Sequence, residues 1–326
     1  MHKQKMKRVS ADEHTTSEPL VWNEGLIPTA GPGQILVRVA AFGINHVDLE
    51  QKMKLYPRPA GAGPIYGLEL SGTVVAIGPG VKKFSVGDRV MSLVTDGAYA
   101  EYAICQEEVS LLLPSYLSFE EGAAIPESLY TLTLNLWQKT ALKSEETVLI
   151  HGMAGAIGTL AIPLIKAWGS KVYGTVSSPV KQKFCLDLGA DNVFLRNSAN
   201  WTNQSIDIVL DCLGGEIFEK SLAILNKKGR IALIDCIYNE KASIDLGSII
   251  TKQISIFGSV LRPLAIKEKA ELTKFIELNL LPLMIQNQIK APIHRIWSMH
   301  QLEEAHQTLK KANGFGKNVV RIEEYN

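Results

Sequence analysis

Long apolar runs, cysteine and net charge are all scarce in this chain of 326 residues. The apolar stretch at 278–285 is short and contains Pro282, whereas a helix that crosses a membrane needs about 20 residues. The formal net charge is only +1, which disfavours nucleic acid and an anionic membrane surface as main partners. The sequence therefore predicts that the chain binds neither a nucleic acid nor a membrane.

Cysteine is too sparse, and too widely spaced, for a metal pair of the C-x-x-C kind. Each cysteine lies in an apolar run, where a buried thiol is the common arrangement; the four are Cys105, Cys185, Cys212 and Cys236. The basic start at residues 3–8 has no apolar segment behind it, so it does not resemble a secretory signal. Together these features predict a reduced, cytoplasmic protein.

The order of strand-like and helical runs predicts two domains. The first third contains short runs of strand composition at 35–42, 70–77 and 98–105, separated by Gly, Pro and Asp turns, which indicates antiparallel β structure. The middle third alternates strand-like and helical runs, which is typical of a doubly wound parallel sheet, the α/β fold of the Rossmann kind. Its strand-like runs are at 147–150, 171–176, 191–195, 206–211, 230–235 and 255–260.

The last part of the chain is too short to form a domain of its own. Its pattern predicts two helical stretches over 265–312, with a possible strand near 294–296, and a strand over 318–322. We therefore predict a mainly antiparallel β domain made of 1–125 with 262–326, and a doubly wound α/β domain made of 126–261. This division agrees with the usual domain size of about 150 residues.

The stretch 147–158, TVLIHGMAGAIG, is the most informative part of the chain. An apolar strand leads into a glycine-rich turn, and a helix-compatible run follows, as in a dinucleotide-binding βαβ unit. Met153 stands where the first glycine of the usual motif would be, so an ordinary strand–helix turn remains the alternative. The predicted backbone contacts with the cofactor are Gly152, Ala154, Gly155, Ala156, Ile157 and Gly158.

The end of the second strand of this unit indicates which nicotinamide cofactor is used. Enzymes that use NAD usually carry Asp or Glu about 20 residues after the glycine turn, to hold the ribose 2′-OH. Near Val176 no acid is found, and Ser177, Ser178 and Lys181 follow. Two hydroxyls and a cation suit a 2′-phosphate, so we predict NADPH, although Lys181 is alternatively a solvated residue in the first turn of a helix.

In this order, the motifs resemble those of the medium-chain dehydrogenase/reductase superfamily, and more narrowly its zinc-free NADPH quinone oxidoreductases. The resemblance runs almost end to end through segments at 67–74, 86–90, 97–102, 123–126 and 211–215. Further echoes, AIPE at 124–127 and SVLR at 259–262, suggest the p53-inducible quinone oxidoreductase type.

The resemblance implies a GroES-like catalytic domain for 1–125 with 262–326 and a Rossmann cofactor domain for 126–261. It also implies further cofactor contacts at Thr131, Cys212, Leu213, Asp235, Ser259, Val260, Leu261 and Lys317. A tyrosine that often covers the adenosine in relatives is not evident, and Arg196 or Trp201 is the expected substitute.

The same resemblance implies that zinc is not used. Zinc alcohol dehydrogenases of the superfamily place a Cys, a His and a further Cys at the catalytic metal. Aligned positions here hold Asn45, Leu68 beside Glu69, and Glu127. Asparagine and leucine do not supply the thiolate or imidazole ligands of a tetrahedral zinc site. We therefore expect no metal.

The expected activity is hydride transfer from NADPH to a quinone or another small electrophilic acceptor. Asn45 and Tyr56 match positions that line the cleft in family members, so Asn45 is expected to donate a hydrogen bond and Tyr56 to stack on the quinone. Tyr56 is alternatively a loop tyrosine that rests on the core, and His46 and His151 are not expected to be essential. Alternative functions are reduction of activated C=C bonds, as in 2-alkenal or enoyl reductases, and NADPH binding without catalysis.

A homodimer is also expected. The run at 255–260 is the last strand of the predicted parallel sheet and carries no charged residue. Charged residues usually protect such an edge from pairing. As in family members, pairing of this strand with its twofold copy would cover the edge.

Overall fold

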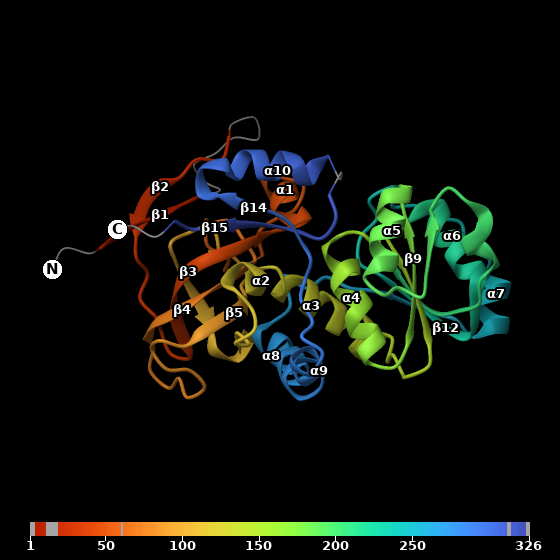
Figure 1. The fold of residues 1–326 in the computed structure, drawn as a ribbon, viewed down its shortest axis with the longest axis horizontal. Coiled ribbons are helices and arrows are strands. Elements are labelled where there is room, and N and C mark those ends of the chain that lie inside the picture. The colour runs from red at the N-terminus through yellow and green to blue at the C-terminus, as the bar shows by residue number, and fades with distance from the viewer. Residues whose placement is uncertain (1–3, 11–18, 60, 312–313, 324–326) are drawn as a thin grey trace. The chain divides into compact units, whose positions relative to one another are not determined.

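The computed structural model describes residues 4–10, 19–59, 61–311 and 314–323 (Figure 1). The chain divides into two compact units. The first comprises Met1–Tyr130, Arg262–Glu277 and Lys290–Asn326, and the second comprises Thr131–Leu261 and Leu278–Ile289.

The first unit is built on a mainly antiparallel sheet with the strand order β14-β15-β3-β4-β5-β7, and β6 also pairs with β3. Its strands are β3 (Gln34–Ile44), β4 (Glu69–Ile77), β5 (Arg89–Leu93), β6 (Tyr102–Gln106), β7 (Ser110–Leu112), β14 (Ile293–Ser298) and β15 (Lys317–Arg321). A separate antiparallel pair is formed by β1 (Lys5–Arg8) and β2 (Asn23–Leu26). The helices are α1 (His46–Lys52), α2 (Phe119–Ala123), α8 (Ile266–Phe275) and α10 (Leu302–Lys310), with short helical turns at Glu107–Val109 and Met299–Gln301.

Strand β3 is central because its apolar side chains fill the core of this unit. Ile35, Val37 and Val39 alternate along it and are buried. Phe42 then stacks on Tyr99, with ring centroids 4.3 Å apart. Strand β3 therefore ends next to a buried aromatic cluster, and its end places Asn45 at the start of α1.

The second unit is a parallel sheet with the strand order β10-β9-β8-β11-β12-β13. Its strands are β8 (Thr147–His151), β9 (Lys171–Val176), β10 (Asn192–Leu195), β11 (Ile206–Asp211), β12 (Leu225–Leu233) and β13 (Ser255–Gly258). The helices are α4 (Ala156–Ala167), α5 (Pro179–Asp187), α6 (Gly215–Ile224), α7 (Leu246–Lys252) and α9 (Leu281–Gln286), and helical turns occur at Thr133–Lys139 and Ala199–Asn203. A further helical turn, Ile276–Leu280, spans the boundary between the units. Helix α3 (Pro126–Leu132) spans the boundary between the units. Figure 1 shows α4 and α5 on one side of the sheet and α6 and α7 on the other, so the sheet is doubly wound.

The predicted fold class, a doubly wound parallel sheet plus a mainly antiparallel β unit, is confirmed. Three details differ from the expectation. Residues 126–130, expected in the α/β domain, belong to the first unit. The strand expected at 98–105 begins only at Tyr102. Residues 278–289, expected in the β domain, belong to the second unit, because α9 packs on α4 and buries Met284.

Candidate active site

Most of the residues predicted to bind the cofactor lie where the parallel strands of the second unit end. β8 ends at His151, β9 at Val176, β11 at Asp211, β12 at Leu233 and β13 at Gly258. Because these strands run in the same direction, their carboxyl ends meet at one edge of the sheet. The strand order reverses between β8 and β11, and ligands of open α/β sheets bind at such a switch point.

The glycine turn after β8 has the local geometry that a phosphate site requires. Gly152 has φ of +68°, a left-handed conformation that favours glycine. Gly155 is exposed and caps α4, so the N–H groups of the first helical turn have no acceptor within the helix. A Cβ on Gly158 would lie 2.2 Å from the Met153 carbonyl oxygen, so only glycine permits this packing.

Met153 does not disturb the turn, although it replaces a glycine of the usual motif. Its side chain is fully buried. A Cβ on Gly174 of β9 would lie 2.3 Å from the Met153 sulfur, so the missing side chain at Gly174 leaves the space that Met153 fills. The turn therefore keeps its shape. Of the other predicted contacts in it, Ala154 is buried, and Ala156 and Ile157 are half-buried.

His151 is a structural residue of this edge. Ser221 donates its hydroxyl to the Ile217 carbonyl oxygen, so its oxygen accepts from His151 Nε2–H at 2.8 Å. Thr175 then donates to Nδ1 at 2.8 Å. Burial lowers the pKa of His151 to about 3, so the imidazole is neutral and both ring nitrogens are satisfied.

Two cations and two hydroxyls gather after β9. Ser178 caps α5, and its Oγ accepts from the Lys181 N–H at 3.4 Å; Ser177 beside it is exposed. The Arg196 N–H donates to the Val176 carbonyl oxygen at 2.9 Å, which brings Arg196 to the same strand end. Burial, and then the nearby Arg196 charge, lower the pKa of Lys181. This corner is suited to a dianionic phosphate.

The structure separates the two residues expected at the adenine end. Trp201 is fully buried, contacts the His151 ring edge-on and donates its indole N–H to the Arg196 carbonyl oxygen, so it is a core residue and the expectation for it is wrong. The Arg196 guanidinium instead lies over the Tyr238 ring, 4.8 Å from its centroid. Tyr238 is a residue that the sequence reasoning missed, because it follows a different strand.

The remaining predicted contacts of the second unit lie in two groups. In one, Ser259 donates to the Asn135 side-chain oxygen, and Asn135 donates to the Thr131 carbonyl oxygen, both at 2.8 Å; Val260 and Leu261 follow in the chain, and Val260 is 54% exposed. In the other, the Leu213 N–H donates to Asp211 at 2.7 Å. This second group lies in the loops after β11 and β12 and consists of Cys212, Leu213 and Asp235.

A buried charged cluster lies around Asn45 in the first unit. Asn45 Nδ2 donates to Glu69 Oε1 at 2.9 Å, and Lys317 Nζ donates to Asn45 Oδ1 at 2.6 Å. Lys317 Nζ lies 2.5 Å from Glu69 and 3.7 Å from Glu127 Oε2. Burial alone would lower the pKa of Lys317, but the Glu69 and Glu127 carboxylates raise it. The ammonium therefore stays charged and fixes which way the Asn45 amide faces.

The arrangement of this cluster disagrees with two roles, cofactor contact by Lys317 and zinc binding. Lys317 was expected to contact the cofactor, but its ammonium is 2% exposed and already paired with oxygens of its own unit. A zinc ion does not fit either, since Asn45, Glu69 and Glu127 surround that ammonium and Leu68 is a buried apolar residue. Among the residues that the structure describes, no group of three or more His, Cys, Asp or Glu side chains could hold a metal.

A second buried network adjoins Asn45. Asp48 Oδ2 accepts from the Asn45 backbone N–H at 2.8 Å and from the Tyr99 hydroxyl at 3.1 Å. The Tyr99 oxygen also lies 2.9 Å from His306 Nε2. Burial raises the pKa of Asp48 to about 7 and lowers that of His306 to about 3. No local pattern in the sequence indicates this network, because it joins α1, a loop and α10.

Tyr56 lies in the loop after α1 and is half-buried. Its ring centroid is 5.7 Å from the Arg262 guanidinium carbon, and burial raises the pKa of its hydroxyl. His46, in contrast, is exposed at the start of α1. The structure therefore places Asn45 and Tyr56 in one unit, at the two ends of α1, with Arg262 as an unforeseen neighbour.

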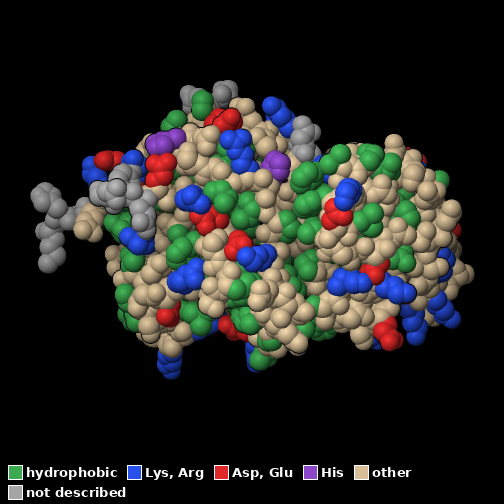
Figure 2. Space-filling view, in the orientation of Figure 1, with side chains coloured by type: hydrophobic (Ala, Val, Ile, Leu, Met, Phe, Trp, Pro, Cys, Tyr) green, Lys and Arg blue, Asp and Glu red, His purple; other side chains and the backbone are tan. Residues whose placement is uncertain are grey.

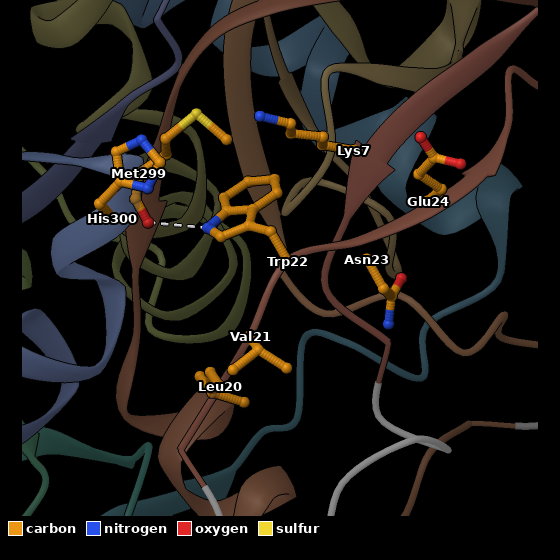
Figure 3. Close-up of a pocket in the computed structure, with 8 residues that line it drawn as sticks. All are labelled: Lys7, Leu20, Val21, Trp22, Asn23, Glu24, Met299 and His300. Carbon is orange, nitrogen blue, oxygen red and sulfur yellow. Dashed lines mark hydrogen bonds between the residues drawn. The ribbon is translucent and has the colours of Figure 1, made fainter.

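A cavity of about 390 Å³ elsewhere in the first unit is a weaker candidate (Figure 3). It is lined by Lys7, Leu20, Val21, Trp22, Asn23, Glu24, Met299 and His300. The Trp22 indole N–H is already bonded to the Met299 carbonyl oxygen at 2.7 Å. None of the residues predicted from the sequence lines this cavity, so it is not part of the candidate site.

Comparison with known proteins agrees with this organisation. Residues 31–115 match the alcohol dehydrogenase GroES-like domain, and residues 156–278 match the zinc-binding dehydrogenase family. A quinone oxidoreductase of Homo sapiens is 30% identical over 246 residues, which are 72% of this chain and 74% of the relative.

Solved structures share the fold over nearly the whole chain. A mycobacterial protein in complex with NADPH is 25% identical, with a TM-score of 0.83, and the match covers 97% of this chain and 99% of that one. The CurK enoyl reductase is 23% identical, with a TM-score of 0.82 over 98% of this chain and 100% of that one, and shows the fold alone. The chain therefore belongs to the medium-chain dehydrogenase/reductase superfamily of oxidoreductases and, within it, to the zinc-free quinone oxidoreductase type.

Proposed function

We propose that this protein transfers a hydride from NADPH to a quinone and needs no zinc for the reaction. The observation that carries the choice of cofactor is the pair of cations, Lys181 and Arg196, beside Ser177 and Ser178 at the end of β9. The observation that carries metal independence is the Lys317 ammonium, which lies among the residues aligned with zinc ligands.

The second unit would bind the cofactor. NADPH supplies the hydride when it is bound. The free N–H groups at the start of α4 would hold the pyrophosphate, and the close approach of its backbone depends on Gly152 and Gly155. The cation corner after β9 would hold the 2′-phosphate. Thr131, Cys212, Leu213, Asp235, Ser259, Val260 and Leu261 remain proposed contacts for the rest of the cofactor.

The first unit would bind the acceptor. A quinone is already electrophilic, so its reduction needs positioned hydrogen-bond donors rather than a Lewis acid. One N–H of the Asn45 amide is bonded to Glu69 and its carbonyl faces Lys317, which leaves the second N–H for an acceptor oxygen. Tyr56, half-buried in its loop, supplies a ring for stacking and a hydroxyl.

Reduction of an activated C=C bond is the second candidate, because it requires the same donors and the same cofactor. The CurK enoyl reductase described above shares the fold of this chain. Side-by-side turnover of menadione and a 2-alkenal with NADPH separates the two functions. We expect menadione to be preferred, Tyr56→Ala to raise KM for bulky quinones, and Asn45→Ala to lower kcat modestly. A clear preference for the alkenal would refute the quinone assignment.

The assembly and location of the protein are also proposals. Strand β13 is an edge of the parallel sheet, and Ile256 and Val260 on and after it are 38% and 54% exposed, so we propose a homodimer through 255–260. Within the described residues no helix is long and apolar enough to cross a membrane. Figure 2 shows basic and acidic side chains interspersed over most of the visible face, which supports a small-molecule partner rather than a nucleic acid. Free cysteines support a cytoplasmic location.

A further inference from the structure

Arg262 is a buried cation that leaves most of its hydrogen-bonding capacity unused. The residue is 5% exposed, and its Nε donates to the Thr95 carbonyl oxygen at 2.9 Å. Within the part of the chain that the structure describes, Nη1 and Nη2 are buried and have no hydrogen-bond partner. Because a guanidinium carries its N–H donors in a rigid, planar fork, both outer nitrogens are presented in a fixed direction.

The position of Arg262 is held from two sides. Lys269, a buried residue of α8, donates from Nζ to the Arg262 carbonyl oxygen at 2.8 Å and to Thr95 Oγ1 at 3.3 Å. The Nε bond to Thr95 then holds the side chain itself. The backbone and the inner edge of the guanidinium are therefore anchored, which fixes the direction of its outer edge.

The neighbouring carboxylates favour the charge of Arg262 but do not occupy its donors. Burial, the largest effect, lowers the pKa of Arg262, and the charge of Asp48 opposes it most strongly among its neighbours. Asp48 Oδ2 accepts from Asn45 and Tyr99, and Asp96 Oδ2 accepts from the Gly63 N–H. Asp48 Oδ1 is buried and, among the described residues, bonds neither to Arg262 nor to another donor. A buried cation without acceptors is disfavoured unless a ligand completes it.

We propose that Nη1 and Nη2 of Arg262 bind the oxygen of the electrophilic acceptor and stabilise the negative charge that develops on it. This inference rests on the proposed function. The hydride brings two electrons and a hydrogen to the acceptor, so the acceptor oxygen carries a negative charge until a solvent proton gives the neutral dihydro product. The Arg262 guanidinium carbon lies over the Tyr56 ring, 5.7 Å from its centroid, which brings the cation to the residue proposed to stack on the quinone. Arg262 would supply a charged donor, whereas Asn45 supplies a neutral one.

The test compares two naphthoquinones with protein saturated with NADP⁺. Lawsone carries an ionised hydroxyl where menadione carries a methyl group, so lawsone imitates the charged acceptor. We expect Arg262→Met to weaken lawsone binding about tenfold or more, measured by calorimetry, and to change menadione binding little. Arg262→Lys should give an intermediate loss, and it keeps the charge if the methionine variant does not fold. The matched control is Arg58→Met, at an exposed arginine whose charge also acts on Arg262.

The turnover of menadione gives a second readout. Arg262→Met should lower kcat on the order of 10²-fold and leave the NADPH dissociation constant unchanged, and Arg58→Met should leave both unchanged. The inference is wrong if unmutated protein does not bind lawsone, or if Arg262→Met binds lawsone and turns over menadione as the unmutated protein does. A failure of the unmutated protein to reduce menadione would instead refute the proposed function, and the lawsone comparison would still decide the role of Arg262.

Discussion

Replacing Lys317 with methionine should destabilise the first unit strongly. The change keeps the length of the side chain but removes the cation that lies 2.5 Å from Glu69 and 3.7 Å from Glu127. Glu69 and Lys317 are at most 2% exposed, so water cannot replace the lost partner. Removing one member of a buried pair in this way costs about 3–5 kcal/mol. That is a large part of the about 5–15 kcal/mol by which a typical protein is stable.

The loss comes from the charge that is left behind, and a second change tests this reasoning. Glu69→Gln in the Lys317→Met background removes the stranded carboxylate charge, and its amide can still accept from Asn45. The double variant should therefore regain a large part of the lost stability. A simple additive account predicts the opposite, because each change on its own removes hydrogen bonds.

Urea unfolding followed by circular dichroism gives the stabilities of the unmutated protein, of the Lys317→Met and Glu69→Gln single variants, and of the double variant. The matched control is Lys52→Met, since Lys52 pairs with Glu303 at 2.7 Å but is partly exposed, with 12% and 29% exposure of the two side chains. The control should cost less than about 1 kcal/mol. The account of the buried cluster is wrong if Lys317→Met costs no more than Lys52→Met, or if Glu69→Gln makes the Lys317→Met variant less stable still.

Three further changes test other parts of the molecule. Burial raises the pKa of Asp48 to about 7, so the folded state keeps a proton that the unfolded chain releases near pH 4, and stability falls as the pH rises between those values. In urea titrations, the unfolding free energy of Asp48→Asn should therefore rise by about 2 kcal/mol relative to that of the unmutated protein between about pH 5 and 7. The same dependence of unfolding free energy on pH in both proteins would contradict this. Lys181→Glu should weaken NADPH binding about tenfold but NADH binding little in fluorescence titrations at low salt, whereas Lys183→Glu, at an exposed residue paired with Asp187, should alter neither selectively. Phe257→Lys, on the edge strand β13, should shift a dimer towards monomer in light scattering, and a monomeric unmutated protein at micromolar concentration would refute the proposed interface.

The sheet edge proposed to bind the cofactor could be predicted from sequence because its signals are local. The glycine turn at 147–158 and the strand ends near Val176 and Asp211 are each read within a few residues. The parallel order of the sheet then brings those ends together without further information. Met153, which replaces a glycine of the usual motif, is accommodated because Gly174 on the neighbouring strand leaves room for its side chain.

The acceptor side could be predicted only in part, because its contacts join distant segments. Asn45 and Lys317 are 272 residues apart and meet because β15 pairs antiparallel with β3, with Asn318 opposite Ile44. A lysine near the end of the chain gives no sign of such a register, so its ammonium was expected at the cofactor. The buried position of Arg262 could not be predicted for the same reason, since its anchors Thr95 and Lys269 lie on separate segments.

The most direct test of the central claim is the ratio of kcat/KM for NADPH to that for NADH, measured with menadione as acceptor on protein treated with a metal chelator. In the proposed site, the cation corner at Lys181 and Arg196 would add charge-assisted hydrogen bonds to the 2′-phosphate, each worth about 1.5–3 kcal/mol. We therefore expect the ratio to be about 10 or more and turnover to be unaffected by the chelator. A ratio near one, or turnover that is lost on chelation and restored by zinc, would contradict the account.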